Sequence, residues 1–189
     1  MPRRCKFTKE DIISAAIDIV REKGMGAVTA RSVGARLNAS TKVVFTYFSG
    51  MDELSRETLK KASEIYYKYI FSAMKRGDEP PYKASGLAYI NFARNERELF
   101  KLLFMRDRRN EIIEEDRESI RPIIEVIKKN TNLSEDEAYN FHLELWTFVH
   151  GIATMIATSY VEWDDEFISK ALTDAYLGLK MRYTKEGQA

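Results

Sequence analysis

The sequence predicts an all-α protein with a small N-terminal domain and a larger C-terminal helical domain. Apolar residues recur at the 3.6-residue period of a helix in most segments of the chain. Only nine Gly and four Pro occur in 189 residues, as expected of long helices with short connections. We place a three-helix helix-turn-helix domain at 1–48 and the larger domain at 49–189. A long helix at 49–76 bridges the two.

Composition indicates a folded, intracellular protein. Hydrophobic residues make up 44% of the chain, enough for a core, and charged residues of both signs make up 31%. The single cysteine, Cys5, excludes an internal disulfide framework and a Cys-based zinc site. No apolar run approaches the roughly 18 residues of a membrane span, and no apolar segment follows the basic N-terminus. We therefore expect a cytoplasmic protein with no membrane partner.

The first helix is expected at 8–23. Thr8 can cap its N-terminus, and Asp11 stands at the third helical position, where it completes a reciprocal capping box. Gly24 follows the last periodic residue and should end the helix.

Residues 29–48, TARSVGARLNASTKVVFTYF, are predicted to form two short helices joined by a tight turn. Thr29 can cap the first helix and Ser40 the second. Asn38 stands where the chain must reverse, and Asn tolerates the left-handed conformation. The outward face is small or hydrogen-bonding, which suits a helix that enters a DNA groove, although many such helix pairs bind nothing.

The long helix is expected from about Gly50 to Arg76, with Ser49 as its cap. A helix of this length can connect two domains rigidly, because it rises about 1.5 Å per residue. The sequence GDEPP at 77–81 is the clearest break in the chain, since two successive prolines stop a helix.

Three shorter segments follow the break. We expect a helix at 82–93 and then a short helix that Glu98 caps by reaching back. The segment 106–118 is almost entirely charged, and indicates either a solvated connection or a helix with a thin buried edge. The next helix is expected at 119–129, with Pro122 in its first turn.

The strongest helix prediction is 134–163, which opens with a capping box at Ser134 and is apolar on more than one face. Asp164 or Asp165 then caps a last helix, 165–182. These two helices carry more apolar surface than one chain needs.

Charge is distributed unevenly along the chain. Residues 1–48 hold nine Lys/Arg and four acidic residues, a net charge of +5, whereas the remainder carries −4. A basic N-terminal domain on an acidic body suits a domain that meets phosphate. The alternative is a small helical domain that happens to carry extra lysines.

From Thr8 to Leu54 the sequence resembles the DNA-binding domain of the tetracycline-repressor (TetR) family of transcriptional regulators. The family pattern has a glycine after the first helix, a threonine opening the second, and a recognition helix of the form Ser-x-x-x-aliphatic-Tyr-x-(His/Tyr)-Phe. The residues at the corresponding positions are Gly24, Thr29, Asn38, Ser40, Val44, Phe45, Tyr47, Phe48 and Leu54. Residues 145–151 also resemble the Trp…His-Gly element of one C-terminal subgroup.

The resemblance implies a homodimer in which helices 134–163 and 165–182 form a four-helix bundle with those of a second subunit. Two recognition helices would then read a pseudo-palindromic site on double-stranded DNA. Effector binding in the larger domain would shift the long helix and change the separation of the two DNA-binding domains. The alternative for the C-terminal helices is a buried core in a monomer.

Predicted DNA contacts lie on the helix pair and on the N-terminal arm. Lys42 can pair with a guanine edge or a phosphate, and Thr41 with a base edge or a thymine methyl group. Two residues depart from the family pattern: Phe45 replaces the usual Tyr and Met51 the usual Lys, which removes two phosphate contacts. The full set is Lys6, Thr29, Arg31, Ser40, Thr41, Lys42, Thr46 and Tyr47, each with a solvated side chain as the alternative.

An effector pocket would be lined by aromatic and methionine side chains of the larger domain. We select Phe92, Phe104, Trp146 and Met155, with core packing as the alternative for each. His142 and His150 lie about 12 Å apart on one helix and cannot share a metal, and His150 is expected to be a hydrogen-bonded interior residue. No cofactor is expected. No HExxH sequence, Gly-rich phosphate loop or nucleophile elbow occurs, which argues against an enzyme.

The sequence thus predicts a DNA-binding transcriptional regulator, a repressor that a small apolar or aromatic effector releases from its operator. The alternative is an all-α interaction or ligand-sensing protein that keeps the fold with weak or no DNA binding. The changes at Phe45 and Met51 are compatible with that alternative.

Overall fold

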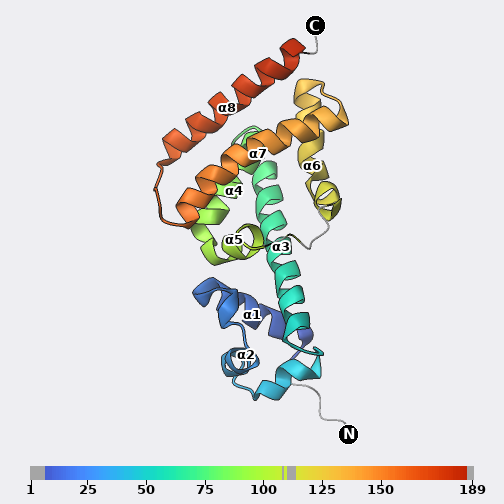
Figure 1. Cartoon of the computed structure of the whole chain (residues 1–189), viewed down its shortest axis with the longest axis vertical. Helices are drawn as coiled ribbons and strands as arrows, with labels where there is room; N and C mark the ends of the chain where they lie inside the picture. Colours follow the sequence, from blue (N-terminus) through green and yellow to red (C-terminus); the bar gives the residue numbers. More distant parts are fainter. Residues whose placement is uncertain (1–6, 108, 110–113, 187–189) are drawn as a thin grey trace. The chain divides into compact units, whose positions relative to one another are not determined.

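The computed structural model describes residues 7–107, 109 and 114–186, and this part of the chain is all-α (Figure 1). Its described residues form eight α-helices and two 3₁₀ helices, with no strand. Each predicted helix corresponds to one of these elements, and the additional element is η1, a single turn at Met25–Ala27. The all-α prediction is therefore confirmed. Within the described ranges, no helix is long and apolar enough to cross a membrane.

By packing, the chain forms two compact units. The first contains Met1–Tyr67 and Glu96–Arg106, and the second contains Lys68–Asn95 and Asp107–Ala189. The long helix α3 (Met51–Arg76) therefore begins in the first unit and ends in the second. The short helix α5 (Arg97–Phe104) belongs to the first unit, where it packs against α1 (Lys9–Lys23). The predicted division between 48 and 49 remains a prediction.

The first unit is built on α1, whose ends are set by the predicted residues. Thr8 and Asp11 form the reciprocal capping box, and Gly24 ends the helix with a φ of 75°. The buried face of α1 carries Ile12, Ala16 and Val20, each fully buried. Arg21 extends from the last turn of α1 and makes two hydrogen bonds, of 2.8 and 2.9 Å, to the Glu96 carboxylate before α5.

The caps predicted for α3 and α5 are wrong. The Ser49 hydroxyl donates to the Glu53 carboxylate at 2.8 Å, and the Gly50 carbonyl accepts the first hydrogen bond of α3. Glu98 does not cap α5, because its carboxylate pairs with Lys101 at 2.7 Å. At both positions, the side chain that was predicted to accept from the free amides at the helix start is bonded to a neighbouring side chain instead.

The second unit is organised around α4 (Pro81–Asn95) and α7 (Glu135–Ala157), which pack against each other most extensively. Phe92, Phe141 and Ile156 are fully buried between its helices. α6 (Glu114–Thr131) packs on both α4 and α7, and α8 (Asp165–Glu186) lies alongside α7 (Figure 1).

Several boundaries in the second unit differ from prediction. α7 opens with the predicted Ser134 capping box but ends at Ala157, because Ser159 adopts a positive φ of 57° that a helix cannot contain. The Asp164 carboxylate accepts from the Phe167 amide at 2.7 Å, so Asp164 caps α8, which continues past 182 to Glu186. α6 begins before 119, which places Pro122 inside the helix. Part of the charged segment 106–118, residues 108 and 110–113, lies outside the described residues.

Candidate nucleic-acid interface

The candidate interface begins with α2 (Ala30–Arg36), whose N-terminus is capped as predicted. The Thr29 hydroxyl accepts from the Ser32 amide at 3.0 Å, and the Ser32 hydroxyl accepts from the Thr29 amide at 2.9 Å. Two of the amides left free at a helix start are thereby satisfied. Thr29 itself is exposed, and so is Arg31 in the first turn of α2.

The turn after α2 depends on two residues, of which the sequence identified one. Asn38 adopts the predicted left-handed conformation, with a φ of 50°. Gly34 was not identified, although it allows the chain to fold back closely: the Ala39 amide donates to the Gly34 carbonyl at 2.8 Å. A Cβ at Gly34 would lie 3.0 Å from the Ala39 carbonyl oxygen. The available signal was a glycine inside a short helix, which often marks a close backbone approach.

The second element of the pair, η2 (Thr41–Thr46), is a 3₁₀ helix. Ser40 occupies its N-cap position, but its side chain makes no capping hydrogen bond, so the predicted cap is wrong. Val44 and Phe48 are buried and anchor the element to the rest of the first unit. The Thr46 hydroxyl donates back to the Lys42 carbonyl at 3.1 Å.

The outward surface of η2 is exposed and carries an available positive charge. Ser40, Thr41, Lys42 and Thr46 are all exposed. Among the described residues, neither Lys42 nor Arg31 has an acidic partner within ion-pairing distance. Because a buried or neutralised cation cannot attract phosphate, these two residues are better placed for DNA than the paired basic residues nearby.

The paired bases in the first unit have structural partners. Lys9 donates to the Glu57 carboxylate at 2.7 Å and lies 5.3 Å from the centre of the Phe48 ring. The hydrogen bond to Glu57 raises the pKa of Lys9, while the same bond lowers the pKa of Glu57. Arg36 pairs with Glu22. Thus only part of the N-terminal charge excess is available to a ligand.

Tyr47 makes a contact that the sequence did not predict. Its hydroxyl donates to the Phe7 carbonyl at 2.7 Å, which ties the end of the helix pair to the residue before the α1 cap. A phosphate oxygen is also an acceptor, so a phosphate contact would need the hydroxyl to give up Phe7. The predicted DNA contact of Tyr47 stays a prediction. Lys6, the other predicted contact near this end, lies outside the described residues.

The four predicted effector-binding residues do not line one described pocket. Phe92 is fully buried against the Tyr69 ring, at a centroid distance of 5.6 Å. Phe104 belongs to the first unit and packs on Tyr66. Trp146 stacks on His150 at 4.9 Å, and Met155 is exposed. Their assignment to an effector stays a prediction.

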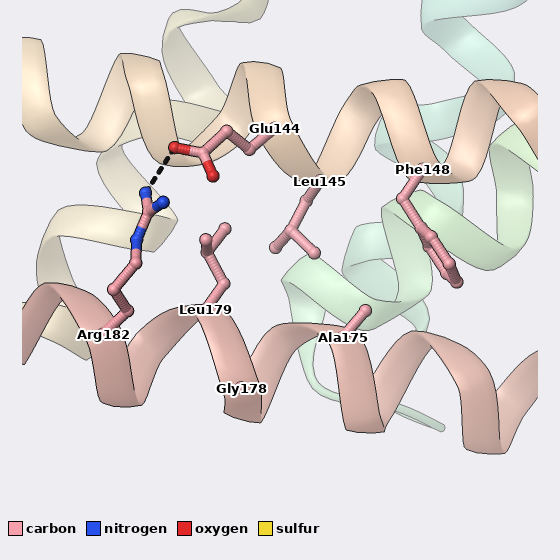
Figure 2. Close-up of a pocket in the computed structure, with 7 residues that line it drawn as sticks. All are labelled: Glu144, Leu145, Phe148, Ala175, Gly178, Leu179 and Arg182. Atoms are coloured by element: carbon pink, nitrogen blue, oxygen red, sulfur yellow. Dashed lines mark hydrogen bonds and ion pairs between the residues drawn. The ribbon is translucent and has the colours of Figure 1, made fainter.

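A different pocket lies between α7 and α8 (Figure 2). It is an open groove of about 290 Å³. The Arg182 guanidinium closes one end by pairing with the Glu144 carboxylate at 2.6 Å. Phe148 and Ala175 lie at the other end, which shows that the two helices run in opposite directions. The lining residues are Glu144, Leu145, Phe148, Ala175, Gly178, Leu179 and Arg182.

Two tyrosine–histidine pairs connect α4 to α7. Tyr82 and His142 are 3.3 Å apart, hydroxyl to Nδ1, and Tyr89 and His150 are 2.9 Å apart. Burial lowers the pKa of His142 to about 4 and also lowers that of His150. His150 is hydrogen-bonded, as we predicted, but it is only half-buried. Groups of acidic, His or Cys residues suited to a metal ion do not occur within the described ranges.

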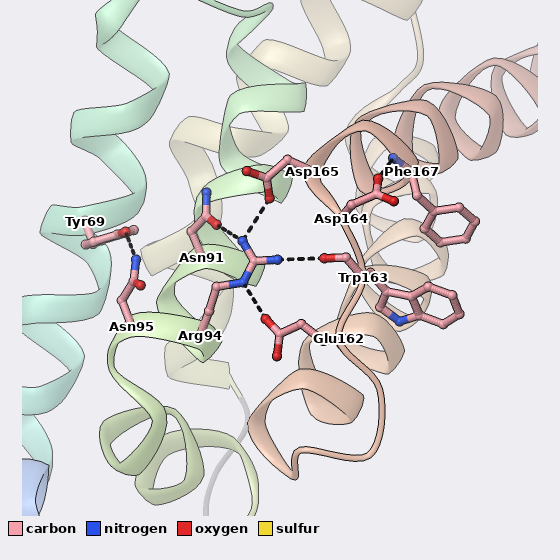
Figure 3. A network of polar contacts seen from close by, with 9 residues as sticks. All are labelled: Tyr69, Asn91, Arg94, Asn95, Glu162, Trp163, Asp164, Asp165 and Phe167. Atoms are coloured by element: carbon pink, nitrogen blue, oxygen red, sulfur yellow. Dashed lines mark hydrogen bonds and ion pairs between the residues drawn. The ribbon is translucent and has the colours of Figure 1, made fainter.

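Arg94 holds the connection between α7 and α8 against α4 (Figure 3). Its guanidinium donates to the Asp165 carboxylate at 2.8 Å and to the Trp163 carbonyl at 3.0 Å, and it lies 3.4 Å from Glu162. The sequence did not identify this cluster, because its members are about 70 residues apart along the chain.

Comparisons with known proteins agree with this architecture. Residues 12–58 match the family "Bacterial regulatory proteins, tetR family", and residues 82–176 match "Tetracyclin repressor-like, C-terminal domain". The chain is 20% identical over 171 residues to the uncharacterized HTH-type transcriptional regulator YobS of Bacillus subtilis (strain 168), covering 89% of this chain and 88% of YobS.

Solved structures show the same fold. A TetR family transcription regulator from Marinobacter aquaeolei VT8 superposes with a TM-score of 0.66 at 13% identity, covering 88% of this chain and 92% of that one. The multidrug binding protein EbrR, complexed with imidazole, gives a TM-score of 0.60 at 18% identity, covering 93% of this chain and 96% of that one.

Proposed function

This chain belongs to the tetracycline-repressor family of bacterial transcriptional regulators, and we propose that it is a repressor that a small effector releases from its operator. The operator would be a pseudo-palindromic site on double-stranded DNA, bound by a homodimer in the cytoplasm. The predicted residues for DNA binding are those exposed on α2 and η2. The family is one of regulators, and we propose no enzymatic activity.

The observation that carries this proposal is the exposed surface of α2 and η2. Lys42 and Arg31 are exposed and lack acidic partners among the described residues, while Val44 holds the 3₁₀ turn in place from inside. A helical turn held by a buried residue, with a cation on its outer face, suits contact with a phosphate or a guanine edge.

Exposed apolar side chains on α7 and α8 support the homodimer. Burying each of them against a second copy would remove its apolar area from water at about 25 cal/mol per Å². A two-fold dimer pairs the same surface of both subunits. The side chains are Leu143, Phe148, Met155, Phe167, Leu177 and Met181, between 38% and 58% exposed.

Sedimentation velocity without DNA tests the dimer. Wild type is expected to sediment as a particle of twice the 21.9 kDa chain mass. Leu177→Glu should shift it toward the monomer, because an unpaired carboxylate would be buried in the interface. Lys129→Glu, at an exposed position on α6, is the matched control. A wild type that sediments as a monomer at all concentrations would refute the homodimer.

The aromatic character of the second unit supports an apolar or aromatic effector. Phe92, Trp146 and Met155 remain our candidates there. EbrR, which shares the fold, is described as a multidrug binding protein and was crystallised with imidazole and with ethidium. Fluorescence of Trp146 and Trp163 gives a direct readout, because the chain has two tryptophans. Ethidium is a suitable first probe. If Trp146→Phe shows as much quenching as wild type, Trp146 does not belong to the site.

Titration with random duplex DNA at several salt concentrations tests DNA binding. A protein that neutralises phosphates shows a steep negative slope of log affinity against log salt. Lys42→Ala should lower affinity and alter sequence preference if it reads a base. Lys170→Ala, which removes an exposed charge on α8, is the control. A flat salt response would favour the alternative, a ligand-sensing protein with weak or no DNA binding.

A further inference from the structure

Phe45 is an exposed aromatic ring in the part of the first unit that would meet DNA. It is 53% exposed, whereas its neighbours Val44 and Phe48 are 0% and 3% exposed. Single exposed apolar residues are common on protein surfaces, so exposure alone assigns no role. The position of this ring on η2 is what distinguishes it.

The 3₁₀ geometry of η2 places Phe45 beside Lys42. In a 3₁₀ helix there are three residues per turn, so side chains at i and i+3 project from the same side. Lys42 and Phe45 stand in that relation, and both are exposed. The Thr46 hydroxyl is directed to the Lys42 carbonyl. The outer side of η2 therefore presents a cation next to an apolar ring.

We propose that Phe45 is a specificity-determining residue whose ring packs on the 5-methyl group of thymine in the major groove. That methyl group is the one apolar group that base pairs present there, and phenylalanine suits contact with it. Lys42, on the same side of the turn, would contact the neighbouring base or phosphate. This inference rests on the DNA-binding function proposed above.

Phenylalanine at position 45, where the family usually has tyrosine, replaces a contact to phosphate with a contact to a base. A tyrosine hydroxyl on phosphate contributes affinity for every sequence, because phosphates carry no sequence information. A phenyl ring on a thymine methyl contributes only where thymine is present. Phe45 thus exchanges a general contact for one that depends on sequence.

Replacing thymine with uracil isolates this contact, because it removes only the 5-methyl group. Duplexes bound by wild type are first selected from a random pool. Each thymine of the tightest duplex is then replaced singly by uracil, and affinity is remeasured. We expect an approximately fourfold loss at the contacted position of each half-site, which is the effect of one buried methyl group; a loss at a thymine contacted by Thr41 would persist in Phe45→Ala.

Two variants assign the effect to Phe45. Phe45→Ala should bind the thymine duplex more weakly and be indifferent to uracil at the contacted position. Lys42→Ala should lose affinity but keep the fourfold uracil penalty. Since Phe45 is exposed, both variants should fold, which circular dichroism and thermal unfolding verify. Phe45→Tyr, which keeps the ring, should retain the uracil penalty and bind every duplex more tightly at fixed salt, with an unchanged salt slope, because the added hydroxyl is uncharged.

The outcomes separate this inference from the proposed function. A wild type that binds duplex DNA with no uracil penalty, or a Phe45→Ala variant that keeps the penalty, overturns the methyl contact alone. DNA bending without a uracil penalty would replace it with a ring inserted between base pairs. A wild type that binds no duplex at any salt concentration overturns both.

Discussion

Acidification should destabilise the second unit through His142. The imidazole is partly buried, and its Nδ1 lies 3.3 Å from the Tyr82 hydroxyl. Burial lowers the pKa of His142 to about 4, because removing the ring from water penalises the charged imidazolium. In the unfolded chain the same group titrates near its ordinary pKa of about 6.5.

The two pKa values set the sign and the size of the effect. Between about pH 6.5 and pH 4 the unfolded state binds the proton and the folded state does not, so stability is lost as the pH falls through this window. Relative to pH 7, the contribution of His142 to the free energy of unfolding should decrease by about 2 kcal/mol at pH 5 and about 3 kcal/mol at pH 4. His150, whose pKa is also lowered, acts in the same direction.

Two measurements test this reasoning. Urea unfolding at fixed protein concentration, at pH 7, 6, 5 and 4, gives the stability loss of wild type and of His142→Gln, in which most of the loss should disappear. Proton NMR gives the pKa directly: the chain has two histidines, so His150→Gln leaves only the His142 signals. A His142 that titrates near 6.5, or a His142→Gln variant that loses as much stability as wild type, would refute it.

Three further predictions concern other contacts. Gly24→Ala should lower the free energy of unfolding, measured by thermal unfolding, by about 1–2 kcal/mol, because φ is 75° there. Gly26→Ala, whose added Cβ would meet nothing, is the control and should be near neutral in the same assay. Tyr47→Phe should cost about 1 kcal/mol by leaving a backbone carbonyl without its donor. A duplex affinity at fixed salt that then changes by less than about twofold would contradict the predicted DNA contact of Tyr47, and a tenfold loss would support it. Arg94→Met should speed hydrogen exchange in the α7–α8 connection, whereas Lys170→Met, which breaks an exposed pair, should not.

Local features of the fold could be predicted from the sequence because they depend on residues a few positions apart. Thr8, Thr29 and Ser134 cap their helices as predicted, since a capping box needs partners only three residues away. Asn38 is left-handed for an equally local reason. The prediction failed at Ser49, where a second local partner competes: its hydroxyl donates to Glu53 and does not accept from the start of α3.

In the candidate site too, the sequence predicted the features that depend on nearby residues and missed those that depend on distant ones. The sequence placed Lys42 on an exposed helical turn that follows a tight reversal, because the pattern of apolar and polar residues carries that information. It did not show that Gly34 allows close approach to Ala39, or that Tyr47 binds the Phe7 carbonyl. The Tyr47 bond joins residues 40 positions apart, and no periodicity reports such a pair.

The sequence by itself determined the helical class, the order of the helices, most of their caps and the family of the chain, because these depend on period, spacing and motif. Only the tertiary structure decided that Phe92 is fully buried while Phe45 is exposed, and that Arg94 binds the chain around Asp165. The reason is physical: burial and ion pairing depend on which segments pack together, and identical side chains have opposite roles according to what covers them.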